Sequence, residues 1–304
     1  MTPPAFGIQV SGPLVGSTPD RGHFRDVAVA AEAAGFDSLW AGDHVSFHHP
    51  LLDVTVALAS FAAVTERICL GAGVLLLPLR APALVAREVA SLDFLSGGRV
   101  ILGVGVGGES PKDFEAVGVP LRERGARTDE AMRALRALFA ARPASFSGSF
   151  SDFDGVRIEP APAQPGGPPL WVGGRSDAAI ERAATLGDGW LPLWVSPERL
   201  AAGIERVRAH AGGRRVTAAV VLPALVGGTV EEARRYLSRR YATDFSTHAT
   251  ERYCLVGPAD RCAERAREYV AAGAEHLVFN PAVEPAWLGA QLERLAEVAG
   301  AAAR

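Results

Sequence analysis

Three of the seven histidines of this chain fall within six positions, at the end of an apolar run. The segment 40–50 reads WAGDHVSFHHP, so that Asp43 and His44 end the run and His48 and His49 follow shortly after. A histidine exchanges protons near neutral pH, and a nearby carboxylate can orient its ring or raise its pKa. We interpret Asp43 and His44 as candidate acid/base residues, with a capped loop as the alternative. Because adjacent residues of a strand point to opposite faces, one of the pair can be purely structural.

The spacing of these histidines does not favour a metal site. Zinc sites often combine spaced histidines with a carboxylate. A pair four residues apart, such as His44 and His48, can share a metal only on a helix, and Pro50 disfavours a helix at His49. We expect no metal here and place His48 and His49 in a loop over the pocket, as candidate substrate contacts.

Two glycine-rich segments follow other apolar runs. The segment GVGVGG (103–108) matches the GxGxxG pattern of dinucleotide-binding loops, but Pro111 and a loop-like stretch stand where the helix of such a loop should begin. We interpret it instead as a flat backbone surface that a planar ligand can approach. In VGGRSDAAIERA (172–183), two glycines, Arg175 and Ser176 precede a helical pattern, which favours an anion site at the helix start. An ordinary capped connection is the alternative there.

These segments belong to a chain that alternates short apolar runs with longer helical patterns. The expected strands cover 6–10, 36–41, 67–74, 99–106, 169–174, 188–194, 215–225 and 274–280. Strict alternation of strand and helix predicts a parallel sheet, and eight such units in 304 residues fit a closed (β/α)8 TIM barrel better than an open sheet. The active site of such a barrel lies at the carboxyl ends of the strands, where His44, both glycine-rich segments and Asn280 fall.

We expect one domain over residues 1–304, interrupted by inserted segments at about 106–124, 142–169 and 242–257. The segment 142–169 has the pattern of a β-hairpin followed by a proline-rich stretch, and 242–257 is expected to be a long loop. Long loops in a compact domain often form lids or pocket walls.

The composition argues against several classes of function. A net charge of −3 does not favour nucleic acid or an anionic membrane as a partner, and no apolar run reaches the roughly 18 residues of a membrane helix. The start of the chain lacks the pattern of a signal peptide, and three cysteines without a CxxC pair favour a reducing compartment, so we expect a cytoplasmic protein. Lys112 is the only lysine, which excludes almost any Schiff-base mechanism.

The chain resembles the bacterial luciferase-like superfamily, and within it most closely the coenzyme F420-dependent oxidoreductases. The resemblance covers about residues 6–195. It is carried by the segments GFDSLWAGDHV, RICLGAGVLLLPLRAPALVAREVASLDFLSGGRVILGVGVGG, FEAVGVPLRERGARTDEAMRALRALF and PLWVGGRSDAAIERAATLGDGWL. It implies a TIM barrel with insertions that holds a deazaflavin or flavin at the carboxyl ends of its strands.

The resemblance also implies roles for particular residues. An Asp-His pair beside the reactive C5 edge of F420 carries over to Asp43 and His44. A bulge behind the ring, often with a non-prolyl cis peptide, carries over to the peptide between Gly73 and Val74. The remaining cofactor contacts carry over to Leu76 beside the bulge, to Val106, Gly107 and Gly108, and to a phosphate-binding turn of Gly173, Gly174, Arg175 and Ser176.

One position departs from the family pattern. F420-dependent sugar-phosphate dehydrogenases carry a glutamate where this chain has Gly108, and Glu109 follows one residue later. We expect this offset to turn the carboxylate away from the ring, which disfavours a sugar-phosphate substrate but keeps Glu109 as a candidate catalytic residue.

The leading hypothesis is an F420-dependent oxidoreductase that transfers a hydride between F420 and an organic, fairly apolar substrate. His44 would exchange a proton, Asp43 would bind or orient the cofactor edge, and an apolar pocket is suggested by Trp40, Val74, Leu76, Trp190 and Trp194. The alternatives are an FMNH2-dependent monooxygenase that uses O2 and a flavin reductase partner, and a non-catalytic member that binds flavin. A homodimer is expected, with the apolar second and third helices as candidate interface faces.

Overall fold

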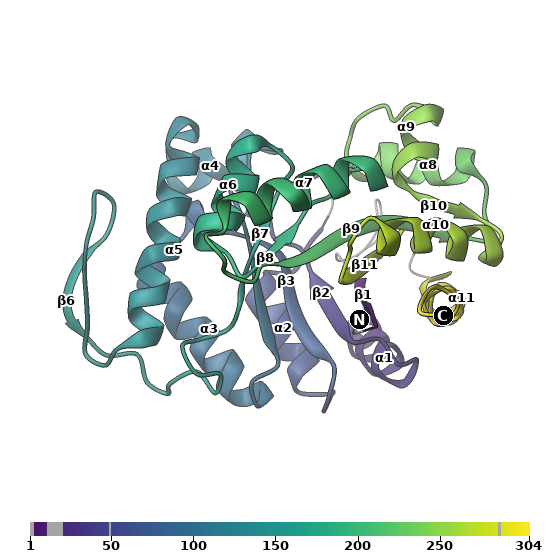
Figure 1. The fold of residues 1–304 in the computed structure, drawn as a ribbon. Helices are drawn as coiled ribbons and strands as arrows, with labels where there is room; N and C mark the ends of the chain where they lie inside the picture. The colour runs from purple at the N-terminus through teal and green to yellow at the C-terminus, as the bar shows by residue number, and fades with distance from the viewer. Residues whose placement is uncertain (1–2, 11–20, 49, 285–286) are drawn as a thin grey trace.

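The computed structural model describes residues 3–10, 21–48, 50–284 and 287–304, and its centre is a closed barrel of parallel strands (Figure 1). The barrel strands are Ala5–Gln9 (β1), Ser38–Ala41 (β2), Cys69–Leu76 (β3), Val100–Gly105 (β4), Leu170–Gly173 (β7), Gly189–Leu191 (β8), Thr217–Val226 (β9) and His276–Pro281 (β11). They neighbour one another in this order, and the pairing of β11 with β1 completes the ring. The prediction of a (β/α)8 TIM barrel is confirmed. Both faces of a parallel sheet are buried, which explains continuous apolar runs such as VILGVG in β4.

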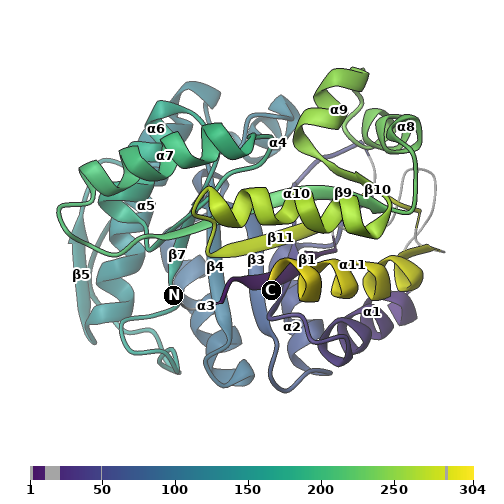
Figure 2. The ribbon, with the colours of Figure 1, turned by 45° about the vertical axis from the view of Figure 1, so that its right-hand side comes forward.

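Most helices cover the outside of the barrel, while Pro111–Val117 (α4) and Thr247–Tyr253 (α9) lie at the end where the carboxyl ends of the strands meet (Figures 1 and 2). The others are Arg21–Ala33 (α1), Val54–Ala62 (α2), Pro82–Ser96 (α3), Arg124–Ala140 (α5), Asp177–Leu186 (α6), Pro197–His210 (α7), Val230–Arg240 (α8), Ala259–Ala271 (α10) and Leu288–Ala302 (α11). Hydroxyl side chains start several of them: Ser176 caps α6 and Ser196 caps α7 by accepting a backbone N–H of the first turn. In Figure 2 the last helix, α11, lies between α1 and α10, and it packs against both.

The expected hairpin within 142–169 is present. Ala144–Ser147 (β5) pairs antiparallel with Asp152–Val156 (β6), and Figure 1 shows this hairpin outside the barrel, next to α5. The carboxylate of Glu130, on α5, accepts hydrogen bonds from three successive backbone N–H groups, those of residues 149–151. The hairpin is thereby anchored to α5 on the far side from the barrel interior.

Two inserted segments contain more regular structure than expected. The expectation of a long loop over 242–257 is wrong, because this segment holds α9 and a short strand, Leu255–Gly257 (β10), which pairs with the end of β9. Ser246 caps α9, and Leu255 is buried, which together fix the segment. In 106–124, the helix α4 begins at Pro111, where a loop-like stretch was expected.

Large side chains fill the barrel interior near the amino ends of the strands. Trp40 has no exposed surface, and its indole Nε1 donates to Ser38 Oγ at 2.7 Å. The same hydroxyl oxygen lies 2.7 Å from His276 Nε2, and Trp171 packs beside both rings. A glycine is required at position 71, because a Cβ there would lie 2.2 Å from ring carbons of Trp40. We call Ser38, Trp40, Trp171 and His276 the lower layer.

The three cysteines are free thiols. Burial raises the pKa of Cys254 to about 12 and that of Cys262 to about 11, which keeps both protonated and unreactive near neutral pH. Within the described residues, no helix has both the length and the apolar character needed to cross a membrane.

Candidate active site

The third strand ends in the expected bulge. The pairing of β3 with β4 shifts register here, and the peptide bond between Gly73 and Val74 is cis. The Val74 side chain packs into the barrel, and glycines at the ends of β4 and β7 make room for it. A Cβ at Gly105 would lie 2.4 Å from Val74 Cγ2, and one at Gly173 would lie 2.8 Å from Val74 Cγ1. Because these positions have no side chains, the main chain itself forms the floor of the cavity that lies between the carboxyl ends of the strands.

Asp43 binds the end of β3 rather than His44. Its carboxylate accepts the backbone N–H of Leu76 at 2.9 Å and two guanidinium hydrogen bonds from Arg80 at 2.5 and 3.0 Å. Burial opposes the charge of Arg80, but the hydrogen bonds and charges of Asp43 and Asp53 outweigh it and raise the pKa of Arg80. Asp43 is 3% exposed and fixes the bulge, so it is the structural member of the pair, and the adjacent carboxylate does not orient His44.

The carboxylate that orients His44 belongs to Asp113, in the first turn of α4. Asp113 Oδ2 lies 2.8 Å from His44 Nδ1, and Oδ1 accepts the backbone N–H groups of Val45 and Ser46 at 2.8 and 2.7 Å. Asp113 is fully buried. A carboxylate can only accept, so Nδ1 carries the hydrogen and Nε2 is left to face the cavity. Sequence reasoning missed Asp113 because 69 positions separate it from His44.

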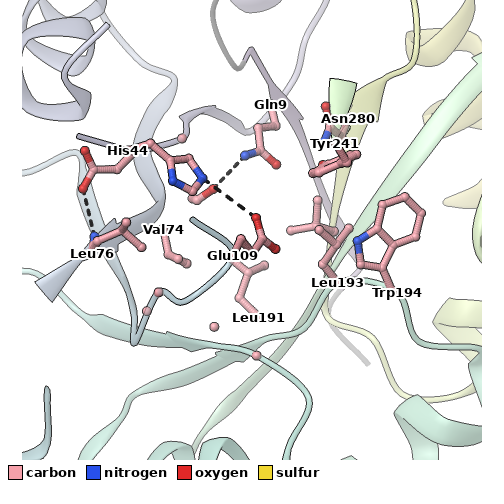
Figure 3. Close-up of a pocket in the computed structure, with 18 of the residues that line it drawn as sticks. Gln9, His44, Val74, Leu76, Glu109, Leu191, Leu193, Trp194, Tyr241 and Asn280 are labelled. Carbon is pink, nitrogen blue, oxygen red and sulfur yellow. Dashed lines mark hydrogen bonds and ion pairs between the residues drawn. The ribbon is translucent and has the colours of Figure 1, made fainter. Parts of the chain in front are cut away.

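Two further residues surround the His44 ring. Phe47 stacks on it, with ring centroids 3.9 Å apart and planes 12° apart. Glu109 Oε2 lies 3.8 Å from His44 Nε2, and a dashed line joins the two side chains in Figure 3. The chain reaches Glu109 through Gly107 and Gly108, which both have positive φ. The one-residue offset therefore leaves Glu109 in the site, with its side chain 60% exposed.

The cavity below His44 has a volume of about 360 Å3, within the range of small-molecule sites, and we call it the inner cavity. It opens at the carboxyl ends of the strands, and Figure 3 shows His44, Glu109, Gln9 and Asn280 around it. The expected cofactor contacts that line it are Asp43, Gly73, Val74, Leu76, Val106, Gly107, Gly173, Gly174 and Arg175.

Two buried amide side chains line the inner cavity on adjoining strands. Gln9 ends β1 and Asn280 lies near the end of β11, and the register that pairs Ile8 with Phe279 makes them neighbours. Gln9 Nε2 donates to the carbonyl of Gly73 at 2.7 Å. Asn280 is 5% exposed, and within the described residues no hydrogen bond reaches its side chain. Sequence reasoning missed Gln9, although a polar residue at the end of an apolar strand could have indicated a place in the site.

A second cavity of about 450 Å3 adjoins the first, and we call it the outer cavity. It shares Phe47, Glu109, Arg175, Trp194 and Tyr241 with the inner cavity. Its further lining residues are His48, Thr243, Phe245, Ala249 and Tyr253.

The remaining sequence-predicted residues take other places. Trp40 and Trp190 do not line the pocket; both are buried, Trp40 in the lower layer and Trp190 against Gly203. Gly108 lies beside the Arg124 side chain, and the hydroxyl of Ser176 accepts from Ala179 N at 3.2 Å as the cap of α6. Neither lines the inner cavity. His49 lies outside the described residues.

Comparison with known proteins gives the family of this chain. A family model described as luciferase-like monooxygenase matches residues 6–253. An uncharacterized protein of Mycobacterium tuberculosis is 38% identical over 209 residues, which cover 61% of this chain and 71% of that protein.

Two relatives with named activities differ in cofactor. An F420-dependent glucose-6-phosphate dehydrogenase of Kineococcus radiotolerans is 36% identical over 56% of this chain and 52% of its own length. An FMNH2-dependent dimethylsulfone monooxygenase of Pseudomonas putida is 32% identical over 70% of this chain and 61% of its own length. The fold matches a solved F420-dependent secondary alcohol dehydrogenase with a TM-score of 0.85, at 18% identity and 99% coverage of both chains.

Proposed function

Because the chain belongs to the luciferase-like monooxygenase family, we propose that it is an oxidoreductase that transfers a hydride between coenzyme F420 and an organic, fairly apolar substrate. The observation that carries this proposal is the His44–Asp113 pair at a cavity whose floor is main chain. The identity to an F420-dependent dehydrogenase supports the choice of cofactor.

The inner cavity fits a planar deazaflavin or flavin ring. Its floor is built from glycines at the ends of three strands, and side chains at Gly105 or Gly173 would collide with Val74. A flat ring can therefore approach the backbone closely. The turn of Gly174 and Arg175 leads into the amino end of α6, where backbone N–H groups and a guanidinium suit a cofactor phosphate. When bound, F420 would supply the hydride acceptor or donor.

His44 would handle the proton that accompanies the hydride. Asp113 keeps the hydrogen on Nδ1, so Nε2 can accept a proton from a substrate hydroxyl or, once protonated, return it to a carbonyl oxygen. The buried carboxylate of Asp113 stabilises the imidazolium that forms. Glu109, exposed and close to Nε2, can pass that proton to solvent.

The charges around the cavities disfavour a sugar phosphate as the substrate. Lys112 is the only lysine, and its ammonium, 69% exposed, binds Glu115 at 2.5 Å outside both cavities. Among the described residues, Arg175 is the cation that the two cavities share, and it is already placed at the cofactor turn. Arg240 also lines the inner cavity, but it is buried and donates a hydrogen bond to the hydroxyl of Tyr236 at 3.1 Å. The substrate side of the site is instead lined largely by aromatic residues.

An FMNH2-dependent monooxygenase is the second candidate, because the Pseudomonas putida relative matches a larger share of this chain. Titration of the purified protein with F420 and with FMN, followed by tryptophan quenching and thermal shift, separates the two. A bound ligand stabilises the fold by mass action. We expect the larger thermal shift with F420. A preference for FMN, together with O2 consumption when a flavin reductase supplies FMNH2, would overturn the proposal.

A further inference from the structure

The outer cavity has walls of aromatic side chains from separate segments of the chain. Phe47 follows β2, Trp194 follows β8, Tyr241 and Phe245 follow α8, and Tyr253 ends α9. The cavity adjoins the inner cavity, because Phe47, Trp194 and Tyr241 line both. A molecule that reacts beside His44 can therefore extend into this aromatic space.

The aromatic wall is held in place before any ligand binds. Trp194 packs against Phe245 at 4.9 Å and edge-on against Tyr241 at 5.7 Å, measured between ring centroids. Its φ is +60°, a left-handed conformation that is uncommon for a bulky residue. The Arg175 guanidinium donates to the carbonyl oxygen of Trp194 at 3.2 Å and so supports this conformation. The indole is thereby fixed at the junction of the two cavities.

The outer cavity has few charged side chains that could bind a highly charged ligand. Among the described residues, the acidic and basic side chains that line it are His48, Glu109 and Arg175, and Arg175 is engaged with the Trp194 carbonyl. Aromatic rings favour stacked or edge-to-face contacts with another ring. A planar, uncharged aromatic group suits such walls best.

We propose that the outer cavity is a substrate subsite for an aromatic ring, so that the substrate is an aryl-substituted alcohol or ketone. This inference rests on the proposed function, because the alcohol carbon must lie in the inner cavity beside His44. Oxidation of such an alcohol would pass its O–H proton to His44 Nε2 and would leave a ketone, with the C–H hydride accepted by the oxidised F420 of the proposed function. Reduction of the ketone would be the reverse, with the proton returned from His44 to the carbonyl oxygen.

Direct binding tests this subsite without turnover. The probes are acetophenone and cyclohexyl methyl ketone, which share size and carbonyl group but differ in planarity and aromatic character. We expect acetophenone to quench the tryptophan fluorescence and bind about tenfold more tightly than the cyclohexyl ketone. Equal affinity for the two ketones would overturn the proposal.

Variants of Phe245 locate the binding. Phe245→Leu is expected to lower the affinity for acetophenone about tenfold, and Phe245→Tyr is expected to retain it. Phe150→Leu, in the turn of the distant hairpin between β5 and β6, is expected to leave this affinity unchanged. The F420 affinity should be the same in all three. Loss of F420 binding in Phe245→Leu, with acetophenone unaffected, would assign the outer cavity to the cofactor instead. If wild type binds acetophenone but not F420, the proposed cofactor is wrong while the aromatic subsite stands.

Discussion

Two histidines of the same barrel have opposite surroundings. His276, in the lower layer, is 7% exposed and pairs with the hydroxyl of Ser38, and burial lowers its pKa to about 4. His44, at the carboxyl end of β2, pairs with a buried carboxylate through Nδ1 and faces a cavity through Nε2. A histidine of this barrel is thus structural where its neighbours are neutral and closely packed. It is suited to proton transfer where one ring nitrogen contacts a carboxylate and the other faces a cavity.

The positions of the glycines explain why the two ends of the barrel differ. In the lower layer, Gly71 makes room for Trp40, which then fills the interior completely. Near the upper end, Gly105 and Gly173 make room for Val74, a much smaller side chain, and open space remains above it. Glycines that make room for a neighbouring side chain therefore let the interior be filled at one end of the barrel and leave a ligand cavity at the other.

Among variants of the residues around His44, the largest effect is expected from Asp113→Asn. The amide can still accept from the backbone of Val45 and Ser46, but its NH2 group would meet the N–H of His44 and favour the other tautomer. Turnover should fall by about 10²-fold or more. The pH profile of turnover should also change in shape, because the tautomer that accepts the proton is lost.

Two controls accompany that variant. Asp43→Asn alters a carboxylate that binds Arg80 rather than His44, so it should lower thermal stability and leave the shape of the pH profile intact. Denaturant unfolding of Asp113→Asn separates lost proton transfer from lost folding. If folded Asp113→Asn has the same pH profile as wild type, Asp113 does not orient the His44 ring.

On acidification, the free energy of unfolding is expected to fall by about 3 kcal/mol because of His276 in the lower layer. The folded pKa of His276, about 4, lies below its ordinary value of 6.5, so the unfolded chain binds the proton first. This contribution to the free energy of unfolding is complete above pH 6.5 and is lost as the pH falls toward 4.

The variant His276→Gln tests this assignment. Denaturant unfolding at pH 7.5 and pH 5 should show a smaller acid loss in His276→Gln than in wild type. The exposed His248→Gln serves as the matched histidine control and should behave like wild type. Identical pH dependence in all three proteins would refute the assignment of acid sensitivity to the lower layer.

A smaller effect is expected from Asn280→Leu. The Asn280 amide faces the inner cavity and is expected to hydrogen-bond the molecule bound there. Its loss should weaken ligand affinity by about tenfold, the equivalent of one ordinary hydrogen bond. Leucine is of similar size, so the free energy of unfolding should not fall. Isothermal titration of both proteins measures the difference, and equal affinities would exclude Asn280 from the site.

Local pattern predicted the barrel but not the partners of its functional residues. Strand–helix alternation gave the eight strands, and the runs around His44, Gly107 and Arg175 pointed to one end of the barrel. The α9–β10 unit was missed because Leu255–Gly257 is too short to show a period, and it is ordered only by pairing with β9.

The partner of His44 was missed for the same reason. Residues adjacent at a strand end point to opposite faces, which allowed one of the pair to be structural, and Asp43 is that residue because it turns toward Arg80. The residue that serves His44 comes from α4, which follows a different strand. Contacts between loops of a barrel form only when the whole ring of strands closes, so a local sequence pattern does not predict them.

The central claim is that His44, and not His276, carries the proton in the reaction. Single-turnover reduction of F420 by an aryl alcohol, followed by absorbance in wild type and His44→Ala at saturating cofactor, tests it most directly. We expect the rate constant to fall by about 10²–10⁴-fold in His44→Ala while the F420 dissociation constant stays within about twofold. His48→Ala, at the outer cavity, should keep nearly the full rate constant. A wild-type rate constant in folded, F420-loaded His44→Ala would contradict the claim.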